Sequence, residues 1–444
     1  MRADAGSGLF RDRAFWGMTS TQLLGAFNDN LFKQLVLLIC VDAAAMDGLG
    51  QDYQPVALAL FAIPFVLFSG FAGFLSDRLS KRGIVVLMKI AEIAIMSLGM
   101  AAFFLGVAFP GWQLPLLFVV LFLMSTQSAF FGPSKYGILP ELFADRDLPQ
   151  ANGIIQMTTF VAIIFGTALA GYGKDWFPDR LWIVSGICVA IAVLGTLTSL
   201  FVRKTPVAHP GLEFQWSALT INRETRTMLR ADTLLLEVLL VSSIFWFLGG
   251  VMLPAANSFG KIQLELDNSR TSLLGAFMGV GIALGCVVSG KLSHQQVNFR
   301  LVRIGSWGLV IALALLWLLG RRHNALTLEL PKVDAAEITE FWSRFVMLAV
   351  GFFGGLFIVP LQVFMQARPP EDQKGRMIGA MNLINWLAIC LAAVFMGLAT
   401  LTLDRWQLSP HWIFGSMALM LLPVAVFYHP PDEKLNGEAE AESS

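Results

Sequence analysis

About twelve apolar segments, each long enough to cross a lipid bilayer, follow one another along this 444-residue chain. A transmembrane helix needs roughly 20 mostly apolar residues. The segments lie near residues 15–40, 55–75, 84–108, 114–133, 151–172, 181–202, 233–256, 271–290, 301–320, 343–365, 376–402 and 411–428. Only 14% of the residues are charged, against roughly 25% in an average soluble protein. The sequence therefore predicts an all-α polytopic membrane protein.

A long basic connection near the middle of the chain divides these segments six and six. It contains an amphipathic run at 222–230, which is typical of a surface helix lying on lipid headgroups. Pro133 and Pro360 fall near the ends of the fourth and tenth segments, and a charged loop follows each of them. This correspondence indicates two parallel repeats. We expect an N-terminal six-helix bundle at 1–202, a cytoplasmic linker at 203–232, a C-terminal six-helix bundle at 233–428 and a disordered acidic tail at 429–444.

Lys and Arg gather in alternate loops, and this sets the expected orientation. The loops at 43–54 and 109–113 contain neither residue, whereas the loops of the other set are basic. Because cytoplasmic loops carry the excess of Lys and Arg, we expect both termini in the cytoplasm. No small-residue cleavage site follows a short apolar core at the N-terminus, so we expect the first segment to be retained. The external connection at 321–342 is long and mixed in charge, and we expect a loop there.

Glycines four residues apart in the apolar segments predict close helix packing. Such pairs let the backbones of two membrane helices approach each other. The pairs are Gly275 and Gly279, Gly281 and Gly285, and Gly351 and Gly355.

The first apolar segment carries an unusual polar stripe. Asp29 and Lys33 lie four residues apart near its middle, so they share one helix face. A charge at the centre of a membrane helix costs roughly 2.5 to 3.5 kcal/mol on the translocon scale. Gln22, Asn28 and Asn30 extend the stripe. It is expected to face a bundle interior or a water-filled cavity. Two interpretations stay open: contact with a polar cargo, or an internal ion pair that holds the helices together.

Further polar residues lie inside or at the ends of other segments. Each has a structural alternative, as an internal ion pair, a membrane-edge residue or an interhelical hydrogen bond. These candidates are Lys89, Glu92, Lys135, Tyr136, Gln156, Asn382 and Asn385.

The short loop between the second and third segments carries the stretch GFLSDRLSKR at 73–82. It resembles the major facilitator superfamily signature G-x-x-x-D-R-x-G-R-K, and departs from it at Ser80. The resemblance implies the superfamily fold, with twelve helices in two six-helix halves, and a gating role for Gly73, Asp77, Arg78, Arg82 and Glu141. Asp77 is expected to accept from a helix N-terminus of the other half, because that end carries partial positive charge. Arg78 is expected to pair with Glu141.

Two stretches narrow the resemblance. GAFNDNLFK at 25–33 and GPSKYGILPEL at 132–142, followed by QANG at 150–153, are similar to the lysophospholipid transporter family. This implies alternating-access transport of lysophospholipid, such as lysophosphatidylethanolamine, across the bacterial inner membrane. Delivery is expected at the cytoplasmic face, where an acyltransferase would restore the diacyl lipid. In this interpretation Asp29 meets an amine, while Lys33, Lys89 or Lys135 meets phosphate. The polar residues named above are the candidate substrate-binding set.

Other classes of function lack their motifs. None of the five His residues begins a His-x-x-x-x-Asp acyltransferase motif, and there is no nucleophile elbow, Walker loop or His-Glu-x-x-His. The four Cys are scattered without metal spacing, and the net charge of zero does not suggest nucleic acid. We therefore expect a monomeric transporter with no enzymatic activity, cofactor or metal. The alternative is an ion-coupled exporter of drugs or other small amphiphiles.

Overall fold

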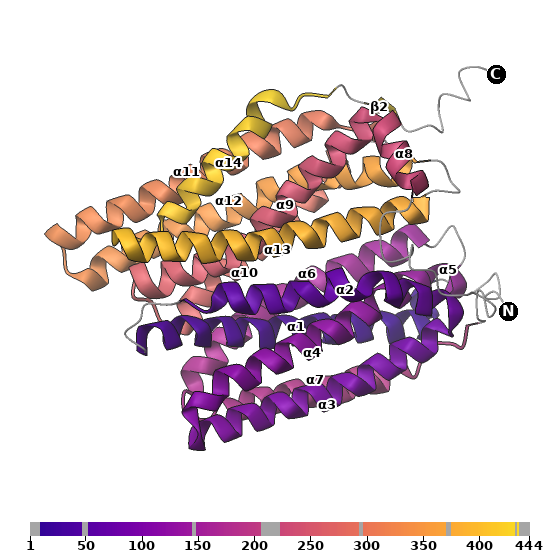
Figure 1. The fold of residues 1–444 in the computed structure, drawn as a ribbon, viewed down its shortest axis with the longest axis horizontal. Helices are drawn as coiled ribbons and strands as arrows, with labels where there is room; N and C mark the ends of the chain where they lie inside the picture. Colours follow the sequence, from indigo (N-terminus) through magenta and orange to yellow (C-terminus); the bar gives the residue numbers. More distant parts are fainter. Residues whose placement is uncertain are drawn as a thin grey trace. The chain divides into compact units, whose positions relative to one another are not determined.

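The computed structural model is almost entirely α-helical (Figure 1). It describes residues 9–46, 52–143, 148–205, 223–292, 296–369, 374–430 and 433–434. Each expected apolar segment corresponds to one helix: α1 (Arg13–Met46), α2 (Gln54–Arg78), α3 (Lys81–Ala108), α4 (Pro110–Gly137), α6 (Leu148–Trp176), α7 (Leu181–Ser199), α9 (Thr233–Ser258), α10 (Asn268–Leu292), α11 (Phe299–Glu329), α12 (Lys332–Ala367), α13 (Lys374–Trp406) and α14 (Trp412–Phe427). Four short helices are η1 (Leu9–Arg11), α5 (Leu139–Leu142), α8 (Arg223–Ala231) and the π-helix η4 (Phe259–Gln263).

Length and composition suit a membrane for most of these helices. Within the described residues, ten helices are long and apolar enough to span a bilayer. Helix α14 is apolar but only 16 residues long. Helix α6 has 29 residues and carries several polar side chains. The predicted all-α polytopic fold is confirmed.

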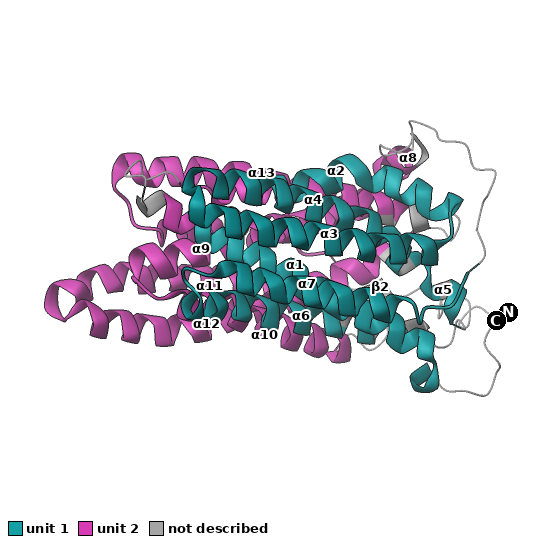
Figure 2. Ribbon diagram, turned by 90° about the horizontal axis from the view of Figure 1, so that it is seen from below, with its two compact units in different colours: residues 1–40, 60–220 teal, residues 41–59, 221–444 magenta. Residues whose placement is uncertain are grey.

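The chain divides into two compact units (Figure 2). Unit 1 comprises Met1–Cys40 and Leu60–Thr220, and unit 2 comprises Val41–Ala59 and Ile221–Ser444. The boundary after Thr220 falls inside the expected linker at 203–232. The end of α1 and the start of α2 group with unit 2. The exact division into two six-helix bundles stays a prediction.

In unit 1, α3 packs against both α4 and α7. An apolar cluster gathers near the first turn of α1, where Phe15 and Met18 are fully buried against Val85, Ile138 and Ile155. These residues come from α1, α3, α6 and the turn before α5. The cluster fixes the end of the unit that carries the α2–α3 turn.

In unit 2, α10 and α12 approach backbone to backbone. A Cβ atom added at Gly281 or Gly285 of α10 would collide with the backbone of Leu348 or Phe352 of α12. A Cβ atom at Gly351 or Gly355 would collide with α10 in the same way. The close packing predicted from these two glycine pairs is confirmed. Helix α11 packs against α12 and α14, and α13 packs against α9.

The connection at 321–342 is not a loop. Helix α11 continues to Glu329 and α12 begins at Lys332, so only Leu330 and Pro331 separate them. The prediction was wrong because it used apolarity to place helix ends, whereas a helix in water can be polar on every exposed side. Pro331 does not interrupt a helix. It lies just before the first helical residue of α12, where a backbone N–H is not needed for the helix.

The structure also describes parts of the amphipathic run at 222–230 and of the C-terminal tail at 429–444. In α8, Thr225 and Leu229 are buried while Arg226 and Arg230 are exposed, as an amphipathic surface helix requires. A two-residue strand, β2 (Glu433–Lys434), pairs antiparallel with β1 (Gln296–Val297). The rest of the expected disordered tail, at 431–432 and 435–444, lies outside the described residues.

Candidate functional site

The polar residues of α1 point to different neighbours. Asp29 accepts a hydrogen bond at 2.7 Å from the hydroxyl of Ser128 in α4. Gln22, seven residues earlier, donates at 3.1 Å to the hydroxyl of Thr159 in α6. Helix α6 lies directly on this part of α1, since a Cβ atom at Gly166 would come within 2.6 Å of the carbonyl oxygen of Phe27. The stripe is thus bordered by α4 on one side and α6 on the other.

Lys33 has neutral partners. Its Nζ donates at 3.2 Å to Oδ1 of Asn30 and lies 4.8 Å from the ring centroid of Phe61 in α2. Asp29 and Lys33 are both partly buried. The ion pairs found among the described residues do not join these two side chains. An ion pair between Asp29 and Lys33 is therefore not among the contacts of the described residues, and their role in binding a cargo stays a prediction.

A second polar group lies deep inside unit 1. Lys89 and Glu92 form an ion pair, and each residue is only 1% exposed. Asn28 donates to Glu92 at 2.8 Å and to the carbonyl oxygen of Cys188 at 3.2 Å. Gly25 leaves room for the lysine, because a Cβ atom there would lie 2.8 Å from its Nζ. This geometry favours the structural alternative for Lys89 and Glu92: they tie α1, α3 and α7 together.

The turn between α2 and α3 is held by a cation other than the expected one. Glu141 pairs with Lys81, not with Arg78. Lys81 begins α3, whose first turn lies beside Gly137 at the end of α4. Arg78 is exposed, with its guanidinium 5.8 Å from the ring centroid of Phe74. The expected Arg78–Glu141 pair is therefore corrected to Lys81–Glu141.

The remaining residues of this motif have separate environments. Ser80, the position that departs from the superfamily signature, caps α3 by accepting from the backbone N–H of Gly83 at 3.4 Å. Arg82 donates to the carbonyl oxygen of Val202 at 2.6 Å. Asp77 is exposed, and no atom lies within 4 Å of a Cβ added at Gly73. The contact expected between Asp77 and a helix of the other half stays a prediction.

The other candidates are divided. Asn385 of α13 is buried and accepts a hydrogen bond at 3.3 Å from Ser243 of α9, which makes it an interhelical contact. Asn382, one turn earlier, is exposed. Lys135 is buried near the end of α4. The side chains of Tyr136 and Gln156 lie outside the described residues.

Sequence reasoning missed a buried polar cluster in unit 2. Gln54, at the start of α2, donates at 3.0 Å to the hydroxyl of Ser258 and accepts at 2.9 Å from Asn257, both in α9. Asp52 caps α2 by accepting from the backbone N–H of Gln54 at 2.9 Å. Burial raises the pKa of Asp52 above its usual value, although hydrogen bonds from Gln54 and Ser258 oppose this.

A further ion pair in unit 2 joins Lys261 of the π-helix η4 to Asp42 of α1. The only signal in the sequence was a pair of polar residues, Asn257 and Ser258, just beyond a predicted apolar segment. Neither could be matched to a partner some 200 positions earlier in the chain.

Groups of three or more His, Cys, Asp or Glu that could hold a metal ion are absent from the part of the chain that the structure describes.

Comparison with known proteins agrees with this architecture. The sequence model of the Major Facilitator Superfamily matches residues 43–393. The chain is 27% identical over 387 residues to the lysophospholipid transporter LplT of Cronobacter sakazakii, covering 85% of each chain. It is 28% identical over 394 residues to LplT of Salmonella heidelberg, covering 86% of each.

Solved structures show the same fold. The crystal structure of a D-xylose-proton symporter matches with a TM-score of 0.69 at 14% identity, covering 96% of this chain and 98% of that one. A bacterial homologue of the human lysosomal transporter Spinster matches with a TM-score of 0.63 at 15% identity, covering 95% and 97%. At these identities the likeness concerns the fold alone.

Proposed function

Because the chain belongs to the Major Facilitator Superfamily and is a secondary transporter rather than an enzyme, we propose that its cargo is a lysophospholipid such as lysophosphatidylethanolamine. The similarity to LplT proteins along most of the chain supports this cargo class. In this proposal the protein lies in the bacterial inner membrane as a monomer with both termini in the cytoplasm. It delivers lysophospholipid to the cytoplasmic face, where an acyltransferase converts it to diacyl lipid.

The proposal rests on one observation: Asp29 and Lys33 each contact neutral groups and are not joined to each other in an ion pair. A lysophosphatidylethanolamine headgroup has one ammonium and one phosphate. Asp29 and Lys33 present one anion and one cation within a single helical turn, and each is held by neutral groups of unit 1. The ammonium would bind Asp29 and the phosphate would bind Lys33. Such charge-assisted hydrogen bonds are roughly twice as strong as neutral ones.

The mechanism that follows is alternating access, in which the two repeats rock about a central site. The cargo headgroup would bring a counter-charge to Asp29 and another to Lys33, so a loaded site is less costly to enclose than an empty one. The acyl chain needs no polar partner and can stay in contact with lipid. The Lys81–Glu141 pair would keep the α2–α3 turn fixed to the end of α4 while the repeats move.

Reconstitution in vesicles tests the cargo. Labelled lysophosphatidylethanolamine is supplied on one side, and its arrival in the opposite leaflet is followed. We expect Asp29→Asn and Lys33→Gln each to slow transport about tenfold, which corresponds to about 1.4 kcal/mol. Glu329→Gln, a change at an exposed carboxylate of α11, is the matched control and should behave as wild type.

Two outcomes would overturn the lysophospholipid proposal. Wild-type protein that moves the lipid no faster than protein-free vesicles would exclude it. Rapid movement of a cationic amphiphilic dye instead, driven by a proton gradient, would favour the exporter. Repeating the lipid assay with the gradient collapsed decides whether transport is coupled to protons.

A further inference from the structure

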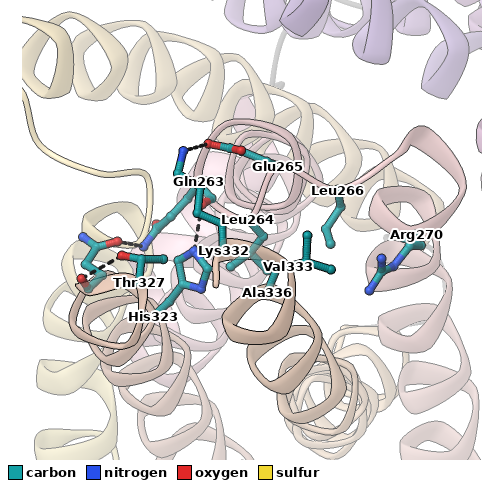
Figure 3. Close-up of a pocket in the computed structure, with 11 residues that line it drawn as sticks. Gln263, Leu264, Glu265, Leu266, Arg270, His323, Thr327, Lys332, Val333 and Ala336 are labelled. Carbon is teal, nitrogen blue, oxygen red and sulfur yellow. Dashed lines mark hydrogen bonds and ion pairs between the residues drawn. The ribbon is translucent and has the colours of Figure 1, made fainter. Parts of the chain in front are cut away.

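A pocket of about 260 Å³ opens in unit 2, outside the residues discussed so far (Figure 3). It forms where the π-helix η4 and the turn to α10 meet the facing ends of α11 and α12. Helices α11 and α12 have 31 and 36 residues, more than the roughly 20 that a bilayer crossing needs. The pocket is therefore expected at the level of lipid headgroups, and the distribution of Lys and Arg assigns it to the external face.

The mouth of the pocket carries one anion and one cation. Glu265 and Lys332 form an ion pair at 2.7 Å, with side chains 63% and 69% exposed (Figure 3). An ion pair this exposed contributes only about 0 to 1 kcal/mol. Ligand charges of the opposite signs can therefore replace it at little cost.

The backbone at Glu265 is held in an unusual conformation. Its φ of 55° lies in the left-handed region, which is uncommon for a residue other than glycine. The turn is fixed on both sides, because the N–H of Leu264 donates to Phe259 and that of Leu266 donates to Gly260. Strained residues of this kind, and π-helices, concentrate at functional sites. The turn directs the carboxylate of Glu265 towards the mouth of the pocket.

The base of the pocket is rigid and its hydrogen bonds are satisfied internally. His323 is 4% exposed, and its Nε2 lies 3.0 Å from the carbonyl oxygen of Gln263. The side chain of Gln263 donates to Gly320 at 2.8 Å and to Asn324 at 3.0 Å. Arg270 is tied to Glu340, with its Nε 2.7 Å from the carboxylate. A ligand would therefore replace the ion pair of Glu265 with Lys332 and leave the hydrogen bonds at the base of the pocket intact.

We propose that this pocket binds the phosphoethanolamine group of a lipid, with the ammonium on Glu265 and the phosphate on Lys332. Leu266 and Val333 line the apolar side, where the glycerol carbons would lie. The volume is below the roughly 300–1,000 Å³ of pockets for drug-sized ligands, so it fits a headgroup and not a whole lipid. The inference rests on the proposed function and adds a first capture site, which selects the headgroup at the external face.

Headgroup selectivity separates this role from a structural one. Initial transport rates are measured against concentration for lysophosphatidylethanolamine and for lysophosphatidylglycerol, which has the phosphate but lacks the amine. Glu265→Gln should raise the half-saturating concentration about fivefold for the first lipid and leave the second unchanged. Lys332→Gln should raise it about fivefold for both. Maximal rates should not change.

Matched controls come from the same helical hairpin. Glu329→Gln and Arg322→Gln remove exposed charges that do not line the pocket, and both should match wild type. If the Glu265–Lys332 pair served only the fold, its two variants would affect both lipids alike. That result, or a lower maximal rate at constant half-saturation, would overturn the proposal.

A direct titration keeps the pocket and the proposed function distinguishable. Purified protein is titrated with soluble glycerophosphoethanolamine, which carries the headgroup without acyl chains. In an Asp29→Asn, Lys33→Gln background, which removes the proposed central site, binding should be kept. It should be lost when Glu265→Gln and Lys332→Gln are added, and Glu329→Gln should leave it unchanged. Absence of binding to wild type would overturn the capture site. Binding without any lysolipid transport would leave the site standing and refute the proposed function.

A final arm identifies the source of the headgroup. Lysolipid transport is compared in vesicles with and without diacyl phosphatidylethanolamine. A capture site for cargo predicts little inhibition, because two acyl chains hold the diacyl headgroup in the bilayer more firmly than one chain holds that of the cargo. Strong inhibition that Glu265→Gln abolishes would assign the pocket to resident diacyl lipid and overturn its role in cargo capture.

Discussion

The ion pair between Lys89 and Glu92 is the most demanding contact in unit 1. Both residues are almost completely buried. Removing an ion from water costs several kcal/mol, and attraction between the partners repays this only with good geometry and further hydrogen bonds. Asn28 supplies one of these bonds to Glu92. The pair is therefore poor evidence of net stabilisation, yet loss of one partner leaves a buried charge without compensation.

A double-mutant cycle measures this dependence. Lys89→Met alone and Glu92→Gln alone should each lower the free energy of unfolding by about 3–5 kcal/mol. The double variant should lose much less than the sum, because it leaves no uncompensated charge. Unfolding is followed by titration with denaturing detergent. Lys204→Met, at an exposed lysine, is the control and should be neutral. Additive losses would show that the two side chains do not interact.

Asn28 and Asp29 illustrate what sequence could say of the site. The sequence placed polar residues at membrane depth and predicted that they avoid lipid. Successive residues of an α-helix differ in direction by about 100°, so Asn28 turns to α3 and α7 while Asp29 turns to α4. Which of the two contributes to packing and which stays available could not be predicted, because the answer depends on where the neighbouring helices lie.

Among the elements, α10 and α12 form a contact with almost no side chain between the backbones. Gly281 and Gly351 face the partner helix at the closest points. Inside a membrane, helix association depends on packing and not on expulsion of water. A methyl group at this contact therefore separates the helices and removes dispersion contacts along both of them.

Alanine substitutions within α10 test this contact. Gly281→Ala should lower the free energy of unfolding by about 1–3 kcal/mol, the usual range for overpacking. Gly290→Ala lies in the same helix with no atom near the new Cβ. It should be neutral or stabilising by up to about 1 kcal/mol, because alanine favours a helix more than glycine does. Equal effects of the two substitutions on thermal stability would contradict the assignment.

In the hairpin of α11 and α12, the sequence predicted the apolar parts of both helices but not where the helices end. Apolar segments of about 20 residues predicted where both helices cross the membrane. Their polar extensions, Arg321–Glu329 and Lys332–Trp342, were taken for a loop because nothing in their composition separates a solvated helix from one. A hydrogen bond between His323 and Thr339 joins the two extensions to each other, and one between His323 and the carbonyl oxygen of Gln263 joins them to η4. Those tertiary contacts are absent from any local pattern.

For the whole molecule, the distribution of Lys and Arg predicts the orientation in the membrane. Exposed arginines of α8, Arg226 and Arg230, belong to the expected cytoplasmic side. The end of α11 belongs to the expected external side, where Leu328 is 88% exposed. Because the two positions lie in different connections of the chain, each tests independently on which side of the membrane its connection lies.

Cysteine labelling checks this orientation. In whole cells, an impermeant maleimide should label Leu328→Cys, and should label Arg226→Cys only after the membrane is permeabilised. Cys40 and Cys188 are buried, and Cys286 and Cys390 are partly buried, so the unsubstituted protein gives the background. Labelling of Arg226→Cys in intact cells would reverse the predicted topology.

The sequence by itself determined the fold class, the positions of the membrane helices and the superfamily, because apolar length, loop charge and the motif at 73–82 are local properties. Tertiary structure alone decided the partners: Lys81 for Glu141, Ser128 for Asp29, and Gln54 for Asn257. These choices depend on helix rotation and on distances between segments far apart in the chain. The polar residues of α1 were predictable as a group, but only the packed helices separate the buried Asn28 from Asp29 and Lys33.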